Sequence, residues 1–149
     1  WGAQKPAIGV STLAAMAWNG VAAGEGSIIC CCMDARRQQV YNALFEIRDG
    51  RPVRLVPDRA LSVEELAPEL EKYEKRVFLV GDGARLCYNL LGGLGVESTL
   101  APEPLVQQSA YGVCRAAETE KAAPASELLP VYLRLSQAER ERQARLANS

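Results

Sequence analysis

Histidine is absent from the 149-residue chain. This absence excludes a Ser-His-Asp or Cys-His nucleophile and any zinc site that needs imidazole. A basic excess is also missing, because 17 Lys and Arg face 18 Asp and Glu, whereas proteins that bind nucleic acid by counterion release are usually far more basic. No apolar run approaches the roughly 20 residues that cross a bilayer, and the first residues lack the pattern of a secretory signal. The sequence therefore predicts no membrane partner, and its charge balance argues against binding nucleic acid by counterion release.

The cysteines are odd in number and lack the CxxC spacing of a metal site. They stand at positions 30, 31, 32, 87 and 114. The first three lie in an apolar run over residues 27–33 that is typical of a strand buried on both faces, where cysteine acts as a small hydrophobe. We favour this core role over a reactive or metal-binding thiol. We therefore expect no metal, no cofactor and a reducing compartment, the cytoplasm.

Hydrophobic periodicity predicts helices that alternate with strands. The predicted strands cover residues 7–10, 27–33, 38–48, 51–56, 77–80 and 131–135. The predicted helices cover residues 11–24, a stretch from Ser62 in two pieces joined at Pro68, residues 84–91 and 105–120, and a charged stretch from Ser136. Asp49-Gly50 indicates a hairpin turn, and Ser62 with Glu65 forms a capping-box pattern. This order predicts an α/β fold with a mixed sheet and flanking helices.

Helix 105–120 carries the most regular of these patterns. Its apolar residues recur at positions 106, 110, 113, 114 and 117, which predicts one buried face. Pro52 places its strand at a sheet edge, because proline cannot donate a ladder hydrogen bond.

Gly81-Asp82-Gly83 stands between a predicted buried strand and a predicted helix. Backbone N–H groups at such a position can hold a phosphate, but the motif is neither GxGxxG nor GxxxxGK[ST]. We favour a plain turn in which Asp82 lies near the helix cap.

Asp34-Ala-Arg-Arg37 follows the other buried strand, where α/β folds tend to place ligand groups. Arg36 or Arg37 could clamp a phosphate or carboxylate in a bidentate fork. The alternative is a structural turn in which Asp34 accepts backbone N–H bonds and an arginine pairs with it.

Tyr132 and Arg134 lie where a predicted strand joins the last, charged helix. A charged helix of this kind is usually a solvated face. The alternative is a docking surface for an acidic partner or for RNA.

Several segments, in order, resemble one family. They are residues 5–13 (KPAIGVSTL), 33–37 (MDARR) with Val40-Tyr41, 80–84 (VGDGA), and 130–134 (PVYLR) with 137–139 (QAE). Together they resemble the TsaB (YeaZ) family, glycoprotease-like proteins required for N6-threonylcarbamoyladenosine in tRNA. The resemblance implies an actin-like, ribonuclease-H-like ATPase fold of two α/β lobes. It identifies residues 1–149 as the second lobe and carboxyl tail, a single α/β domain with 1–10 as a remnant of the first lobe and 129–149 as a terminal strand and charged helix.

The resemblance also implies a role and partners. The role is that of a non-catalytic accessory subunit beside a TsaD-type catalytic subunit and a TsaE-type ATPase, with a homodimer as a further state and tRNA reached only through the complex. We expect no catalytic residue. Ligand or partner contact is predicted for Asp34, Arg36, Arg37, Tyr41, Gly81, Asp82, Gly83, Tyr132 and Arg134. The alternative function is an enzyme lobe that binds a nucleotide or phosphorylated ligand through residues 81–83 and the two arginines. A peptidase is disfavoured.

Overall fold

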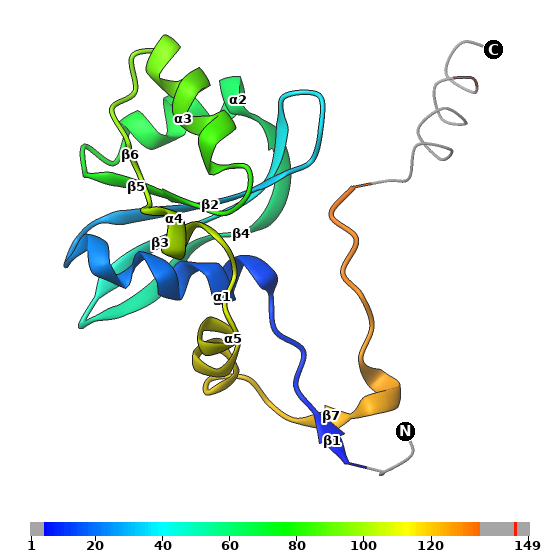
Figure 1. The fold of residues 1–149 in the computed structure, drawn as a ribbon. Helices are drawn as coiled ribbons and strands as arrows, with labels where there is room; N and C mark the ends of the chain where they lie inside the picture. The colour runs from blue at the N-terminus through cyan, green and yellow to red at the C-terminus, as the bar shows by residue number, and fades with distance from the viewer. Residues whose placement is uncertain (1–4, 135–144, 146–149) are drawn as a thin grey trace.

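A five-stranded mixed sheet forms the centre of the computed structural model, which describes residues 5–134 and 145 (Figure 1). Its strands are β2 (Ile28–Asp34), β3 (Gln39–Arg48), β4 (Arg51–Ser62), β5 (Val77–Val80) and β6 (Thr99–Leu100). Their order is β4-β3-β2-β5-β6, with β2 antiparallel to β3 and parallel to β5. The α/β fold with a mixed sheet is thus confirmed.

Helices cover both faces of this sheet, so the unit has three layers (Figure 1). One face carries α2 (Val63–Glu71) and α3 (Ala84–Gly93), and the other carries α1 (Thr12–Ala17), the 3₁₀ helix η1 (Trp18–Ala23) and α4 (Glu103–Val106). Helix α5 (Ala110–Ala117) lies on the outer side of α1 and packs against it. Side chains of β2 alternate between two clusters: Cys30 and Cys32 pack toward α2 and α3, while Ile29 and Cys31 pack toward α1. The cysteines at 30–32 and 87 are fully buried, which confirms their core role.

A small second sheet lies apart from the central one. It pairs β1 (Pro6–Ala7) with β7 (Ala123–Pro124), and the 3₁₀ helix η2 (Ala125–Glu127) follows (Figure 1). The prediction of a strand over residues 7–10 is therefore wrong beyond Ala7. Residues 8–10 instead lead into the N-cap of α1 at Ser11, whose side chain accepts the Ala14 N–H at 3.1 Å.

The β3–β4 hairpin and the capping box are confirmed. Asp49 and Gly50 have φ values of 51° and 67°, as the mirror-image hairpin turn requires. Ser62 and the N3 residue Glu65 cap each other reciprocally at the start of α2. Strand β4 is an edge strand, as Pro52 predicts, but it continues to Ser62 rather than ending near residue 56.

The prediction that α2 divides at Pro68 is wrong. Val63–Glu71 is one helix that contains the proline. Its buried face is formed by Val63, Leu66 and Leu70, and their packing outweighs the one backbone hydrogen bond that proline cannot make.

The predicted helix over 105–120 is divided into α4 and α5. Gln107 is extended at ψ 151°, and Asn19 donates to the carbonyls of Leu105 and Gln107 at 3.0 and 2.6 Å, which satisfies groups that a continuous helix would have used. The predicted apolar face is only partly correct: Val106, Val113 and Ala117 are half-buried, but Ala110 and Cys114 are exposed, and α5 instead buries Gly112 and Ala116.

Residues 131–134 form no strand, contrary to the prediction for 131–135. Residue 135 and the predicted helix from 136 lie outside the described residues, apart from Arg145. No helix in the described part of the chain has the length and apolar character to span a bilayer.

Candidate functional site

The loop between β2 and β3 places Arg36 and Arg37 in an uncommon backbone conformation. Three consecutive residues, Arg36 to Gln38, are left-handed, with φ values of 64°, 55° and 58°. Such a conformation costs a residue other than glycine about 1–2 kcal/mol. The Asp34 carboxylate accepts the Arg36 N–H at 2.7 Å, and the Gln39 N–H donates to the Arg36 carbonyl at 3.1 Å. These bonds hold the loop in place.

Asp34 therefore organises the loop through its backbone, as the structural-turn interpretation predicts. The arginine pairing that this interpretation also predicts is not present. Arg36 and Arg37 are exposed, and neither guanidinium makes a hydrogen bond or ion pair with any described residue. Both cations are available to a partner.

The turn at Gly81-Asp82-Gly83 lies directly against this loop. Asp82 Oδ1 accepts the Asp34 N–H at 3.1 Å, so the turn contacts the strand end rather than capping α3 by a side-chain bond. The N–H groups of Gly81 and Gly83 donate to the carbonyls of Val106 and Cys32, at 2.8 and 3.1 Å. These two N–H groups are therefore used within the protein and do not face a phosphate.

Close approach of two backbones explains both glycines. Gly81 has φ 107°, and a Cβ there would stand 2.0 Å from the Cys32 carbonyl oxygen. A Cβ on Gly83 would stand 2.9 Å from the Asp34 nitrogen. The turn is a packing feature between β5 and β2.

Arg134 joins the same cluster from the far end of the chain. Its Nη1 donates to the Ala35 carbonyl at 2.6 Å. Between η2 and Arg134 the chain leaves the small sheet and runs beside the unit as an irregular stretch (Figure 1). Leu129, Val131 and Tyr132 on this stretch are 77%, 82% and 84% exposed.

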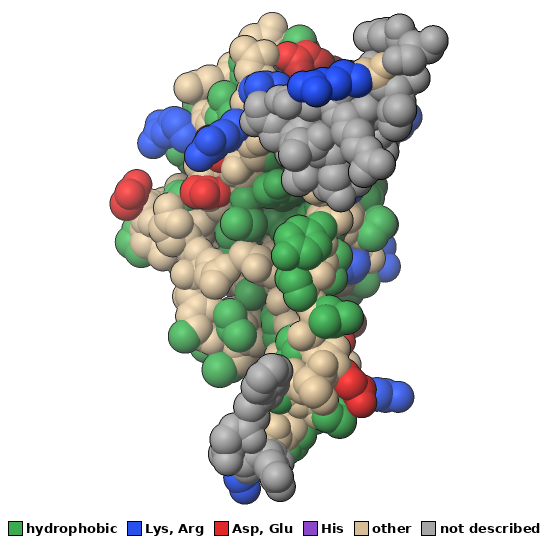
Figure 2. Space-filling model, turned by 90° about the vertical axis from the view of Figure 1, so that its right-hand side faces the viewer, with side chains coloured by type: hydrophobic (Ala, Val, Ile, Leu, Met, Phe, Trp, Pro, Cys, Tyr) green, Lys and Arg blue, Asp and Glu red, His purple; other side chains and the backbone are tan. Residues whose placement is uncertain are grey.

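A groove of about 700 Å³ lies between residues 128–134 and the rest of the unit. Its other walls are residues 9–13 at the start of α1, together with Met33, Tyr41 and Asp58. Lys and Arg side chains gather in the upper part of the face seen in Figure 2, above hydrophobic side chains that continue down it. An exposed apolar surface beside unpaired arginines is typical of a protein-binding site.

Ser11 and Asp58 in this groove form a contact that the sequence did not indicate. Ser11 Oγ donates to Asp58 Oδ2 at 2.5 Å, and Arg54 Nη1 donates to Asp58 Oδ1 at 2.5 Å. The two partners are 47 positions apart, so no local pattern links them. Because Ser11 also caps α1, the contact fixes the groove wall.

The sequence-predicted residues thus fall into two connected groups. Those at the β2 and β5 ends are Asp34, Arg36, Arg37, Gly81, Asp82 and Gly83, and those at the groove are Tyr41, Tyr132 and Arg134. The Arg134–Ala35 bond joins the two groups.

The buried thiols form a separate cluster. Cys30 and Cys32 Sγ lie 3.5 Å apart in the core. Hydrogen bonding to Cys30 and Cys87, together with burial, raises the pKa of Cys32 well above its ordinary value, and burial likewise raises the pKa of Cys31. Protonated thiols are poor nucleophiles. Among the described residues, no group of three or more His, Cys, Asp or Glu side chains is arranged to hold a metal ion.

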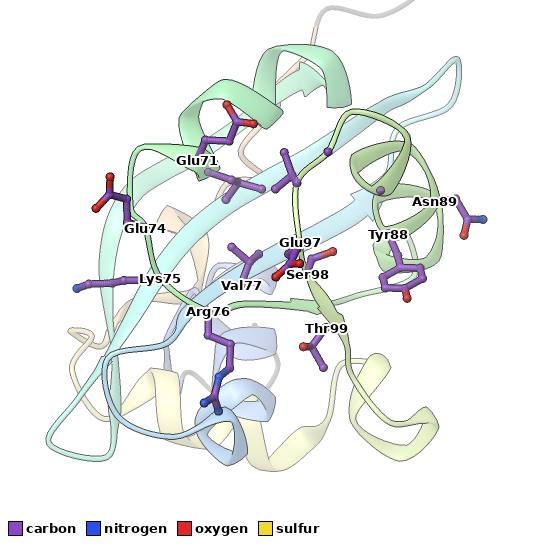
Figure 3. Close-up of a pocket in the computed structure, with 14 residues that line it drawn as sticks. Glu71, Glu74, Lys75, Arg76, Val77, Tyr88, Asn89, Glu97, Ser98 and Thr99 are labelled. Carbon is purple, nitrogen blue, oxygen red and sulfur yellow. The ribbon is translucent and has the colours of Figure 1, made fainter.

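A second cavity, of about 1120 Å³, opens at the amino end of β5 (Figure 3). Glu71, Glu74 and Lys75 border one side, and Tyr88 and Asn89 border the other. The acidic side chains at 71 and 74 extend away from the middle of the cavity rather than converging. None of the sequence-predicted site residues lines it.

The layered mixed sheet places the chain among proteins with the actin-like, ribonuclease-H-like fold. Two solved structures from Pseudomonas aeruginosa share it: a protein described as similar to the peptidase YeaZ, and YeaZ itself. Each matches with a TM-score of 0.61, over 89% of this chain and 61% of that chain, at 22% and 20% identity respectively.

Sequence comparison then defines the family. A model described as "TsaD: tRNA N6-adenosine threonylcarbamoyltransferase" matches residues 1–140. The tRNA threonylcarbamoyladenosine biosynthesis protein TsaB of Bacillus subtilis is 29% identical over 144 residues, which are 93% of this chain and 60% of that protein. The chain belongs to this family of TsaD-type and TsaB/YeaZ-type proteins, and it spans 60% of the length of its curated relative.

Proposed function

We propose that the chain is a non-catalytic accessory subunit in the formation of N6-threonylcarbamoyladenosine in tRNA, acting with a TsaD-type catalytic subunit. The relatives support the pathway by name. The observation that carries the accessory role is the arrangement of the candidate residues. Arg36, Arg37 and Tyr132 face solvent, and the Arg134–Ala35 bond joins the loop that carries the two arginines to an open groove, as a docking surface requires.

The nucleotide-binding alternative loses its main support at residues 81–83. A phosphate cradle needs backbone N–H groups that point at the ligand. Here the N–H groups of Gly81 and Gly83 bond to the protein's own carbonyls, and both glycines serve the contact between two strands. Without a phosphate-binding turn beside them, the exposed side chains of Arg36 and Arg37 do not by themselves form a nucleotide site.

A TsaE-type ATPase as a further partner, a homodimer and a cytoplasmic location stay predictions from the family resemblance and from the free thiols. The Pseudomonas protein is described as similar to a peptidase. Burial raises the pKa of Cys31 and contributes to the raised pKa of Cys32, which makes these two thiols poor nucleophiles for such a reaction.

Reconstitution tests the proposal. Purified TsaD-type subunit, TsaE-type ATPase, activated threonylcarbamoyl donor and tRNA are combined with and without the chain, and the modified nucleoside is measured. We expect product only when the chain and the catalytic subunit are both present, and none from the chain alone.

Calorimetry with ATP and with ADP decides the alternative. Absent or millimolar binding by the chain supports an accessory role. Micromolar binding by the chain alone would contradict it.

A further inference from the structure

Residues 129–133 have the composition of a β-strand but no strand beside them. The sequence Leu-Pro-Val-Tyr-Leu is rich in strand-forming residues. Leu128, which enters the stretch, is extended, with φ −74° and ψ 109°. Within the described chain, however, no backbone N–H or C=O of residues 129–133 makes a hydrogen bond.

Contacts with other described residues hold this stretch at both of its ends. Leu128 approaches residue 9 closely, because a Cβ built on Gly9 would stand 3.1 Å from Leu128 Cδ2. Arg134 is tied to Ala35 at the other end. Five residues between these anchors span about 16 Å when extended, and they border the groove of about 700 Å³. An exposed stretch with strand-forming residues and unpaired backbone groups, beside a groove, can form a strand against an extended partner segment.

We propose that residues 129–133 pair with an extended segment of a partner polypeptide, which lies along the groove and presents a carboxylate to Arg36 and Arg37. The inference names the surface through which the accessory role would act, and it rests on the proposed function. Main-chain pairing supplies affinity in this mode of recognition, and side chains that alternate into the groove supply specificity.

Charge favours an acidic segment. The Arg134–Ala35 bond brings the end of the stretch to the loop that carries Arg36 and Arg37, whose guanidiniums have no partner among the described residues. Guanidinium groups pair with carboxylates in a bidentate geometry, and such pairs steer association at a rim.

Pro130 determines which edge of the stretch is used. Successive residues of a strand direct their N–H groups to opposite edges. The edge of residues 130, 132 and 134 lacks one donor, because proline has no N–H, whereas the edge of residues 129, 131 and 133 is complete. The partner strand therefore pairs along the edge that includes Val131.

This asymmetry provides a matched pair of proline variants. Val131→Pro removes a donor from the pairing edge, and Tyr132→Pro removes one from the opposite edge. Val131→Ala and Tyr132→Ala measure the loss of each side chain with its N–H retained. Both positions that these four variants change are exposed, so the core is untouched.

The assay is the affinity of the 149-residue chain for the TsaD-type subunit of the same organism, measured by biolayer interferometry. We expect Val131→Pro to weaken binding at least fivefold relative to Val131→Ala, and Tyr132→Pro to match Tyr132→Ala. Equal affinities of the two residue-131 variants would overturn the inference, and so would a wild-type chain that does not bind.

Arginine variants test the acidic partner. Arg36→Glu with Arg37→Glu should weaken binding about tenfold at low salt and less at high salt, because screening reduces exposed charge interactions. Arg51→Glu, an exposed arginine at the opposite end of the hairpin β3–β4, is the control and should have no effect. Equal effects of the two changes would contradict the assignment of this loop.

Two further readouts separate the possible failures. If Val131→Pro abolishes a dimer of the chain in light scattering without changing the affinity for the TsaD-type subunit, a second copy is the occupant and the inference is wrong. If the wild-type chain and Val131→Pro support modification equally in the reconstituted reaction, the inference fails and the proposed function stands. If the wild-type chain supports no modification, both fail.

Discussion

Replacing Gly81 by alanine tests the structural role of the turn between β5 and α3. Two costs arise. The backbone at φ 107° disfavours any Cβ, which costs about 1 kcal/mol, and the new Cβ would meet the Cys32 carbonyl oxygen at 2.0 Å. That oxygen accepts the Gly83 N–H, so it cannot retreat without breaking a bond at the end of β2.

Gly24 offers the matched control. Its φ is 90°, and a Cβ there meets nothing within 4 Å, so Gly24→Ala isolates the backbone cost at about 1 kcal/mol. Overpacking against an immobile group adds about 1–3 kcal/mol. We therefore expect Gly81→Ala to lower the free energy of unfolding by about 2–4 kcal/mol in total.

Urea unfolding, followed by far-UV circular dichroism, measures both variants. If Gly81→Ala leaves too little folded protein, Gly83→Ala serves instead, because its φ carries no strain and its Cβ would stand 2.9 Å from the Asp34 nitrogen. We expect about 1–2 kcal/mol for that change. Equal midpoints for Gly81→Ala and Gly24→Ala would refute the argument that close backbone packing requires Gly81.

Three other predictions follow from the contacts of single residues. Hydrogen bonds from Lys75 and then from Arg48 lower the pKa of Glu46. Its contribution to stability is therefore full above the ordinary value near 4.5 and is lost as the pH falls through the lowered native value, so Glu46→Gln should reduce the melting temperature more at pH 7 than at pH 3. An equal deficit at both pH values would contradict this origin. Ser62→Ala removes the N-cap of α2 and should cost about 1 kcal/mol in urea unfolding, whereas an unchanged midpoint would show that the cap is not needed. Arg134→Ala should speed the cleavage of residues 128–133 by chymotrypsin and leave the hydrogen exchange of β2 unchanged, and an unaltered cleavage rate would contradict the anchoring role of this bond.

Local signals account for the parts of the fold that the sequence predicted well. Asp49 and Gly50 tolerate positive φ, Ser62 and Glu65 form the capping box, and β2 is apolar throughout. In each case the decisive interactions lie within a few residues of one another. Periodicity and turn chemistry therefore suffice.

The division between α4 and α5 depends on distant contacts instead. Asn19 bonds to two carbonyls that lie 86 and 88 positions away, and Gly112 packs against the backbone of α1, where a Cβ would stand 2.2 Å from the Ala15 oxygen. The apolar pattern over residues 105–120 predicted that larger side chains would form the buried face of the helix. The small residues Gly112 and Ala116 were the signal for a close helix crossing.

The sequence predicted individual residues of the candidate site but not all of the contacts between them. Asp34 and Asp82 each follow a buried strand, and the parallel pairing of β2 with β5 brings them together across 48 positions. Sequence position placed both at the carboxyl edge of the sheet, but it did not show that the glycines between β5 and α3 serve packing. The strand predicted over 131–135 failed for a different reason, because strand propensity alone supplies no partner strand.

The central claim is that the chain acts in the formation of N6-threonylcarbamoyladenosine in tRNA. Its most direct test is mass spectrometry of tRNA nucleosides from cells depleted of the gene that encodes this chain, and from the same cells after re-expression. We predict that N6-threonylcarbamoyladenosine falls on depletion and returns on re-expression, while other modified nucleosides stay constant. An unchanged level of N6-threonylcarbamoyladenosine after depletion would contradict the account.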